Sequence, residues 1–148
     1  YESPIKKNGR NGYGANSSPD GNTGPVATWK GDKNYYLENE RVGVWQKAMN
    51  KGFDTDELSV DDKFGVASQN FAKTHILWRG QRNNCPSAIK WLQTILRDQY
   101  EFYNLDIDGV FGSYTEKCVK EFQSNRNIKA DGKVGLVTTY YLLEGTVY

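Results

Sequence analysis

The chain has 148 residues, and its net charge of +1 comes from 19 basic and 18 acidic side chains with no long run of either sign. Nucleic-acid binders usually carry a basic patch or stripe, so this balance argues against a nucleic-acid partner. No apolar run approaches the roughly 20 residues that a membrane-spanning helix needs, so we expect no membrane segment and no membrane partner. Ten Tyr and four Trp favour a protein with aromatic surface available for contact.

Residues 1–35 are predicted to form an irregular arm. They are rich in Gly, Asn, Ser and Pro and read as successive turns without hydrophobic periodicity. We expect this arm to be ordered against the rest of the protein, with Tyr13, Val26 and Trp29 as its anchors. Asn16-Ser17-Ser18 fits a glycosylation acceptor, although that pattern is common by chance.

From Tyr35 onward the pattern becomes helical. Apolar residues recur at helical spacing on two successive faces, formed by Val42, Trp45 and Met49 and then by Ile89, Leu92, Ile95 and Leu96. The sequence therefore predicts two amphipathic helices in this part of the chain.

Asp108-Gly109 marks a tight turn, because Asp can bond its own downstream backbone and Gly admits a positive φ without steric cost. Ser113 stands three residues before Glu116, which is the spacing of a capping box at a helix start. Apolar residues of one helical face follow, namely Cys118, Val119 and Phe122. A second Asp-Gly-x-x-Gly at residues 131–135 precedes a last apolar run, residues 136–143, which predicts a final helix.

These motifs occur in a characteristic order: Leu92-Gln93, Asp108-Gly109-x-Phe111-Gly112, Thr115-x-x-x-Val119-x-x-Phe122-Gln123 and Asp131-Gly132-x-x-Gly135. Over about residues 86–145 the chain resembles the peptidoglycan-binding domain type 1 family. The resemblance implies a three-helix fold, no cofactor, and noncovalent binding of a peptidoglycan glycan strand or stem peptide in a shallow groove near the Asp-Gly loops. Carried over residue by residue, the implied ligand-binding residues are Asp108, Gly109, Phe111, Gly112, Thr115, Asp131, Gly132 and Gly135.

An offset of 47 residues places an earlier part of the chain on this motif without a gap. It pairs Gln46 with Gln93, and it also pairs Leu58, Asp61, Phe64 and Gly65 with Leu105, Asp108, Phe111 and Gly112. We therefore interpret residues 36–84 as a degenerate first copy and residues 85–148 as the second. In the first copy Asp62 replaces the turn glycine, Val66 stands in the place of Ser113, and no second Asp-Gly-x-x-Gly follows His75. The predicted fold class is mainly α, with tandem three-helix repeats after the irregular arm.

The two cysteines, Cys85 and Cys118, both fall in the second copy, at the entry to one predicted helix and inside the next. If these helices pack together, a disulfide between them would close a loop of about 30 residues and stabilise the domain by roughly 3–4 kcal/mol. Small secreted domains often use such a bond, so we predict it; two separate buried thiols are the alternative.

Catalysis is not expected. His75 is the only histidine, so a zinc site with several His ligands is hard to build, and we predict no metal. His75 aligns with Phe122 and is expected to be a packed structural residue. A Cys-His nucleophilic pair would need a stabilised thiolate, which an apolar helical position such as that of Cys118 disfavours. The acidic run from Asp54 to Asp62 lacks the spacing of a calcium loop and reads as a solvated loop.

The sequence thus predicts a secreted, extracellular, non-catalytic protein that associates with the bacterial cell wall by binding peptidoglycan. The alternative is a secreted protein-binding factor, such as an inhibitor or a toxin component, that reuses this fold as a scaffold. The incomplete first copy and the Gly-rich arm motivate that alternative, since neither is needed to hold a wall polymer.

Overall fold

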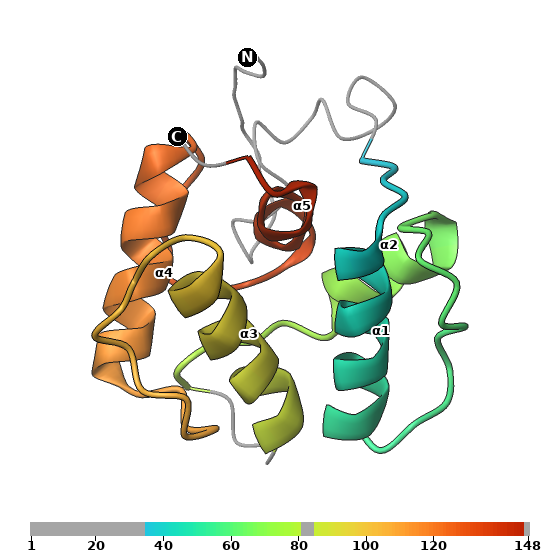
Figure 1. Cartoon of the computed structure of the whole chain (residues 1–148), viewed down its shortest axis with the longest axis horizontal. Helices are drawn as coiled ribbons and strands as arrows, with labels where there is room; N and C mark the ends of the chain where they lie inside the picture. Colours follow the sequence, from blue (N-terminus) through green and yellow to red (C-terminus); the bar gives the residue numbers. More distant parts are fainter. Residues whose placement is uncertain (1–34, 81–84, 147–148) are drawn as a thin grey trace.

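The structure, a computed structural model, describes residues 35–80 and 85–146, and within these ranges it is built of helices without a strand (Figure 1). The helices are α1 (Glu40–Gly52), α2 (Val66–Thr74), α3 (Pro86–Asp98), α4 (Ser113–Asn125) and α5 (Leu136–Glu144). The prediction of a mainly helical fold is therefore confirmed. None of these helices is long and apolar enough to span a membrane. The predicted arm and its anchors, and the Asn16 acceptor, lie outside the described residues.

Local sequence signals explain where several helices begin and end. The Oδ1 atom of Asn39 accepts a hydrogen bond from the N–H of Val42 at 3.1 Å and so caps the start of α1. Pro86 is the first residue of α3, where its missing N–H costs nothing. Gly145 ends α5 in the left-handed conformation, with φ of 86°.

The helix α5 is the centre of the fold. Seven of its nine residues are buried: Leu136, Val137, Thr138, Thr139, Tyr141, Leu142 and Leu143. A helix that is apolar on all sides must have neighbours on all sides. In Figure 1 it is seen end-on between the pair α1 and α2 and the pair α3 and α4, and it contacts both α1 and α2 directly. Since α1 also packs against α3, the two halves share one core.

The carboxyl end of α5 is held by side chains from several other elements. Nε of Arg41 in α1 donates a hydrogen bond to the carbonyl oxygen of Leu143 at 2.8 Å. The hydroxyl of Tyr100, which follows α3, donates to the carbonyl oxygen of Leu142 at 2.7 Å. Nε2 of Gln99 donates to the carbonyl oxygen of Gly145 at 3.0 Å. These bonds satisfy carbonyl groups that a helix end leaves without an intrahelical partner. The central helix is thereby fixed to both halves of the fold.

Two short backbone contacts also join distant segments. Glu38, before α1, forms an isolated antiparallel bridge with Lys63, and Leu77, after α2, forms one with Val134, before α5. The second bridge has hydrogen bonds of 3.2 and 2.8 Å between the two residues. This bridge therefore joins the segment after α2 to the segment that precedes the central helix α5.

The capping box predicted at Ser113 is wrong. The N-cap of α4 is Gly112, its backbone is extended, and no side chain caps this helix start. Ser113 is already the first helical residue, and the N–H of Glu116 bonds to the carbonyl oxygen of Gly112 at 3.0 Å. The Glu116 carboxylate instead lies 3.4 Å from the guanidinium of Arg79.

The predicted disulfide between Cys85 and Cys118 is absent. Both residues are buried thiols, Cys85 as the N-cap of α3 and Cys118 on the inner face of α4. Burial raises the pKa of both thiols, because the interior disfavours the charged thiolate. The structure thus has the arrangement that the sequence left as the alternative, with two separate cysteines packed in the core.

Candidate ligand-binding loops

The loop at residues 108–112, here called the second loop, is held by the buried side chain of Gln93 in α3. Nε2 of Gln93 donates to Oδ1 of Asp108 at 2.9 Å, to the carbonyl oxygen of Val110 at 3.0 Å and to Oγ1 of Thr115 at 3.2 Å. Its Oε1 accepts from the N–H groups of Asp108 and Gly109 at 3.0 and 2.9 Å. One amide therefore ties the loop both to the helix before it and to the helix after it.

Gln123 in α4 holds the loop at residues 131–135, the third loop, in the same way. Its Nε2 donates to Oδ1 of Asp131, the carbonyl oxygen of Lys133 and Oγ1 of Thr138 at 2.8 to 3.0 Å. Its Oε1 accepts from the N–H of Gly132 at 2.9 Å. The two Asp-Gly loops of the sequence are thus built on the same hydrogen-bond pattern.

The loop at residues 61–65, the first loop, has this pattern too. Nε2 of Gln46 in α1 donates to Oδ1 of Asp61, the carbonyl oxygen of Lys63 and Oγ of Ser68 at 2.9 to 3.1 Å. Its Oε1 accepts from the N–H groups of Asp61 and Asp62 at 3.0 and 3.1 Å. Asp62 has φ of 65°, against 76° at both Gly109 and Gly132. Asp62 therefore adopts the same left-handed backbone conformation as the turn glycines of the other two loops.

The first Asp of the third loop has a different electrostatic setting from the first Asp of the other two loops. The N–H of Val110 and the amide of Gln93 both bond to Asp108, and they lower the pKa of its carboxyl. The amide of Gln46 and the N–H of Lys63 lower the pKa of Asp61 similarly. At Asp131 burial dominates and raises the pKa. The first and second loops therefore hold an exposed carboxylate, whereas the third holds a part-buried one.

The residues that the resemblance implied for ligand contact fall into two groups in the structure. Phe111, Thr115, Gly132 and Gly135 are buried. Asp108 is exposed, and Gly109, Gly112 and Asp131 are partly exposed. The first group shapes the loops from inside, and only the second group and its exposed neighbours are accessible from solvent.

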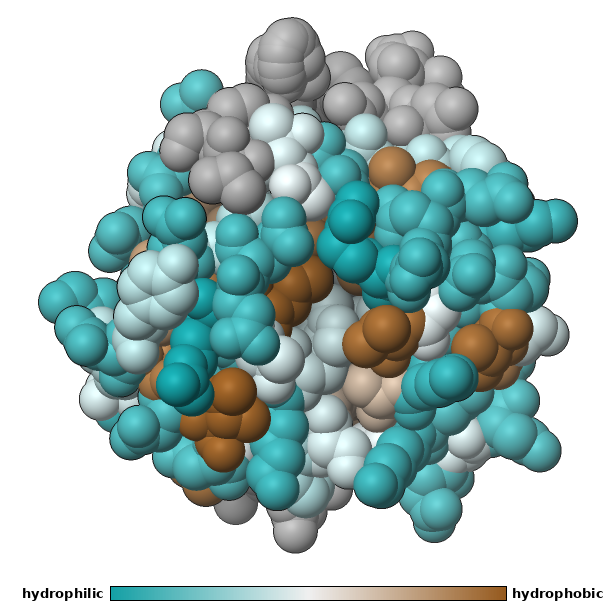
Figure 2. Space-filling view, viewed as in Figure 1, coloured by the Kyte–Doolittle hydropathy of each residue, from teal (hydrophilic) through white to brown (hydrophobic). Residues whose placement is uncertain are grey.

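Sequence reasoning missed those neighbours. Val110 and Tyr114 flank the second loop with exposed fractions of 63% and 43%. Next to the third loop, the Trp78 side chain is 39% exposed, and Nζ of Lys133 lies 5.0 Å from its ring centroid. The motifs leave Val110 and Lys133 unspecified and do not include Trp78 or Tyr114, so the pattern alone carried no signal for them. On the side of the molecule that Figure 2 shows, hydrophobic residues form separate small patches among hydrophilic ones.

Gly112 differs from the turn glycines Gly109 and Gly132, whose φ is positive. Its φ of −94° suits any residue, and a Cβ atom there would meet nothing within 4 Å. Valine at position 112 is therefore not expected to distort the loop. Gly65, the matching residue of the first loop, has φ of −89° and equally open space. A side chain at either position would project from the loop without disturbing it.

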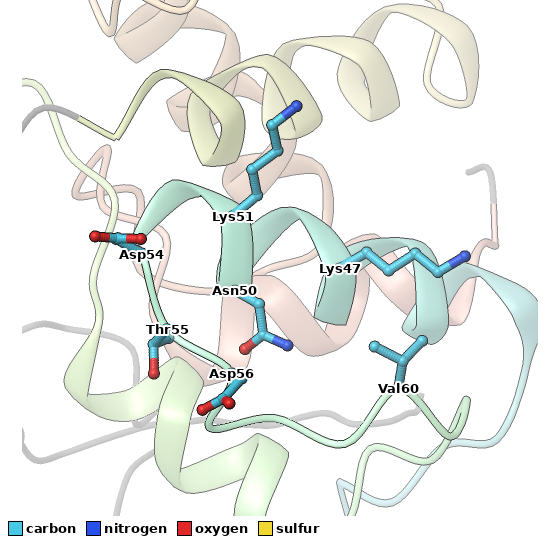
Figure 3. Close-up of a pocket in the computed structure, with 7 residues that line it drawn as sticks. All are labelled: Lys47, Asn50, Lys51, Asp54, Thr55, Asp56 and Val60. Atoms are coloured by element: carbon cyan, nitrogen blue, oxygen red, sulfur yellow. The ribbon is translucent and has the colours of Figure 1, made fainter.

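A shallow hollow of about 810 Å³ lies elsewhere, between the end of α1 and the segment that follows it (Figure 3). It is lined by Lys47, Asn50, Lys51, Asp54, Thr55, Asp56 and Val60. Asn50 is engaged in holding this segment, because its side chain bonds to both the N–H and the carbonyl oxygen of Leu58 at 3.1 and 2.9 Å. In Figure 3 the Lys51 side chain points away from Asp56, so the charged groups do not converge on one point.

Side chains that could together hold a metal ion do not gather in the described part of the chain. No three His, Cys, Asp or Glu side chains in residues 35–80 and 85–146 are placed to bind one ion. His75 is half-buried, and its ring stacks on Phe71 with centroids 3.7 Å apart and an angle of 3° between the rings. His75 thus packs at the end of α2 as a structural residue.

The described part of the chain is a small helical module whose three loops are each held by a buried glutamine. Residues 86–142 match the model of a family described as "Putative peptidoglycan binding domain". The similarity to this family covers α3, α4 and most of α5. The comparisons with curated proteins and with solved structures found no match.

Proposed function

We propose that this protein binds bacterial peptidoglycan noncovalently, through the face formed by the second and third loops. The observation that carries the proposal is that both loops of the matched region, residues 86–142, are held by a buried glutamine in one hydrogen-bond pattern. Rigid loops lower the ordering cost of binding a flexible polymer. The proposed contact residues are Asp108, Gly109, Gly112 and Asp131, with Phe111, Thr115, Gly132 and Gly135 holding the loops in shape.

The proposal extends to the organisation of the chain. We propose that residues 36–84 are a degenerate first copy of the module in residues 85–148, after an arm of residues 1–35. Support comes from the first loop, where Gln46 makes the bonds that Gln93 makes in the second. The first copy lacks a third helix of its own, and α5 fills that place because it packs on α1 and α2.

We further propose that the protein is secreted, associates with the cell wall and acts without catalysis. Its matched family is one of binding domains. The thiols that could act as nucleophiles are buried and have raised pKa values, which disfavours the reactive thiolate.

The matched pair Gly112→Val and Gly65→Val tests where the ligand binds. Valine fits the open space at both positions and costs the same small loss at a helix N-cap, about 0.5–1 kcal/mol or less. We expect Gly112→Val to reduce retention on purified sacculi severalfold, because its side chain covers the second loop. Gly65→Val should bind as the unmodified protein does. Equal retention of both folded variants in a cosedimentation assay would count against a site at the second loop.

A second candidate function, recognition of another secreted protein, has one observation in its favour. The first half exposes three valines that the core does not use, Val44, Val60 and Val66, and Val66 is 77% exposed. Contact with another protein would remove these apolar side chains from water, which stabilises a complex. Failure of the protein to sediment with sacculi, together with saturable binding to a secreted protein, would favour this function over the first.

A further inference from the structure

Residues 77–80, here called the crossing segment, follow α2 and lie against the third loop. Leu77 is fixed by its backbone bridge with Val134, whose two hydrogen bonds are 3.2 and 2.8 Å long. Two residues further on, the guanidinium of Arg79 lies 3.4 Å from the carboxylate of Glu116 in α4. In Figure 1 the chain runs from α2 across the fold toward α4. The first half of the chain therefore places side chains beside a loop of the second half.

Trp78 is the exposed aromatic residue of the crossing segment. It is 39% exposed, whereas Trp45 and Trp91, the other tryptophans in the described ranges, are buried. Its ring is held in place, because Nζ of Lys133 lies 5.0 Å from the ring centroid and a Cβ atom on Gly80 would collide with the six-membered ring. A large apolar side chain that is already ordered loses little conformational freedom when a ligand covers it. Trp78 is therefore suited to contact with a ligand at the third loop.

The polar groups around this ring carry both signs of charge. Arg79 and Lys133 are cationic, and Glu116 is anionic. The Glu116 side chain also covers the turn of the third loop, since a Cβ atom on Gly132 would lie 2.9 Å from its Cγ and 3.5 Å from its Oε2. Lys120 covers the same turn, with Cε 3.2 Å from that Cβ position. Hydrogen-bond donors and acceptors therefore stand together beside an aromatic ring.

This combination fits a sugar better than it fits a carboxylate. The hydroxyl groups of a sugar both donate and accept hydrogen bonds, and its C–H groups can pack on the face of an aromatic ring. A stem-peptide carboxylate would be attracted by Arg79 and Lys133 but repelled by Glu116.

We propose that Trp78 is a ligand-contacting residue and that the part of peptidoglycan bound at the third loop is the glycan strand. A sugar ring packs on the Trp78 side chain, and its hydroxyl groups bond to Arg79 and Glu116. This inference rests on the proposed function and adds which part of the polymer is recognised. It also adds a contact residue outside the matched residues 86–142 and gives the first half a part in binding.

The test measures binding of soluble glycan strands from which an amidase has removed the stem peptides, by isothermal titration calorimetry. Trp78→Ala should raise the dissociation constant about five- to tenfold, as expected when one aromatic contact is lost. Trp78→Tyr keeps an aromatic ring and should retain most of the binding. Circular dichroism checks that each variant has the helical fold.

Tyr36→Ala is the matched control. Tyr36 is an aromatic residue of the first half with a similar exposed fraction, 44%. It lies near the first loop instead of the third, because its hydroxyl donates to Glu38 at 2.8 Å and Glu38 bridges to Lys63. The Tyr36→Ala protein should bind glycan strands as the unmodified protein does.

Tryptophan fluorescence gives a second readout in the unmodified protein. Glycan strands that cover Trp78 remove its indole from water, so the emission should shift to shorter wavelength on titration. Trp78→Phe should bind with nearly the same affinity but without this shift. A shift of equal size in Trp78→Phe would show that the ligand does not cover Trp78.

The outcomes separate this inference from the proposed function. If Trp78→Ala binds peptide-free glycan strands as tightly as Tyr36→Ala does, Trp78 is not a contact residue. If the unmodified protein binds intact sacculi but not peptide-free glycan strands, the assignment to the glycan is wrong and the proposed function stands. If it binds neither, the proposed function itself fails.

Discussion

Gln93→Leu is expected to lower the free energy of unfolding by about 3 kcal/mol or more, and the melting temperature by roughly 10 °C. Leucine fills nearly the same volume but cannot bond to the second loop. The N–H groups of Asp108 and Gly109 and the carbonyl oxygen of Val110 would all lose this partner at a partly buried site. Each such loss costs about 1–3 kcal/mol. Thermal and urea unfolding followed by circular dichroism measures the change.

The neighbouring substitution Thr94→Ala serves as the control for this prediction. Thr94 is exposed, and its hydroxyl bonds only to the carbonyl oxygen of Lys90 one turn earlier, at 2.7 Å. Its replacement should change stability by less than about 0.5 kcal/mol. Gln46→Leu should destabilise the protein as much as Gln93→Leu does. A Gln93→Leu protein as stable as the Thr94→Ala protein would show that the amide does not hold the loop.

The second large effect is a loss of stability at high pH that depends on Tyr100. Burial raises the pKa of this phenol to about 12, and its hydroxyl donates to the carbonyl oxygens of Tyr141 and Leu142. The pKa in the folded protein is above the unfolded value of about 10, so the fold favours the neutral phenol. Its contribution is complete below pH 10 and disappears as the pH rises through 12. A shift of this size corresponds to roughly 2–3 kcal/mol.

Tyr100→Phe separates this effect from the titration of other groups. The variant should be less stable at neutral pH by about 1–2 kcal/mol, because the two carbonyl groups at the end of α5 lose their donor. Between pH 10 and 12 the difference in unfolding free energy between the variant and the unmodified protein should shrink. Urea unfolding at several pH values measures it, and a difference that stays constant over this range would contradict the assignment to Tyr100.

Much of the fold follows from local pattern. The apolar faces at Val42, Trp45 and Met49 and at Leu92 and Leu96 are buried in the structure, as helical spacing predicts. The Asp-Gly dipeptides predicted tight turns, and Gly109 and Gly132 both have φ of 76°. These features depend on a few neighbouring residues, which is why the sequence reveals them.

The remaining features depend on contacts between distant residues. The glutamines that hold the loops lie 15 residues before Asp61 and Asp108 but only eight before Asp131. A buried polar residue in an amphipathic pattern looks like any surface residue, so its role emerges only when the loop folds back on it. The capping box at Ser113 failed because α4 begins one residue earlier than that motif requires, with Gly112 as its N-cap. The position of α5 between both halves is likewise a tertiary property.

Cosedimentation of the unmodified chain with purified sacculi, with cellulose as the control polymer, tests the central claim most directly. We expect sacculi to retain the protein saturably and cellulose not to retain it. Binding should be lost when the sacculi are first digested to soluble fragments and washed away. A protein that stays in the supernatant with intact sacculi, while its circular dichroism shows the helical fold, would contradict it.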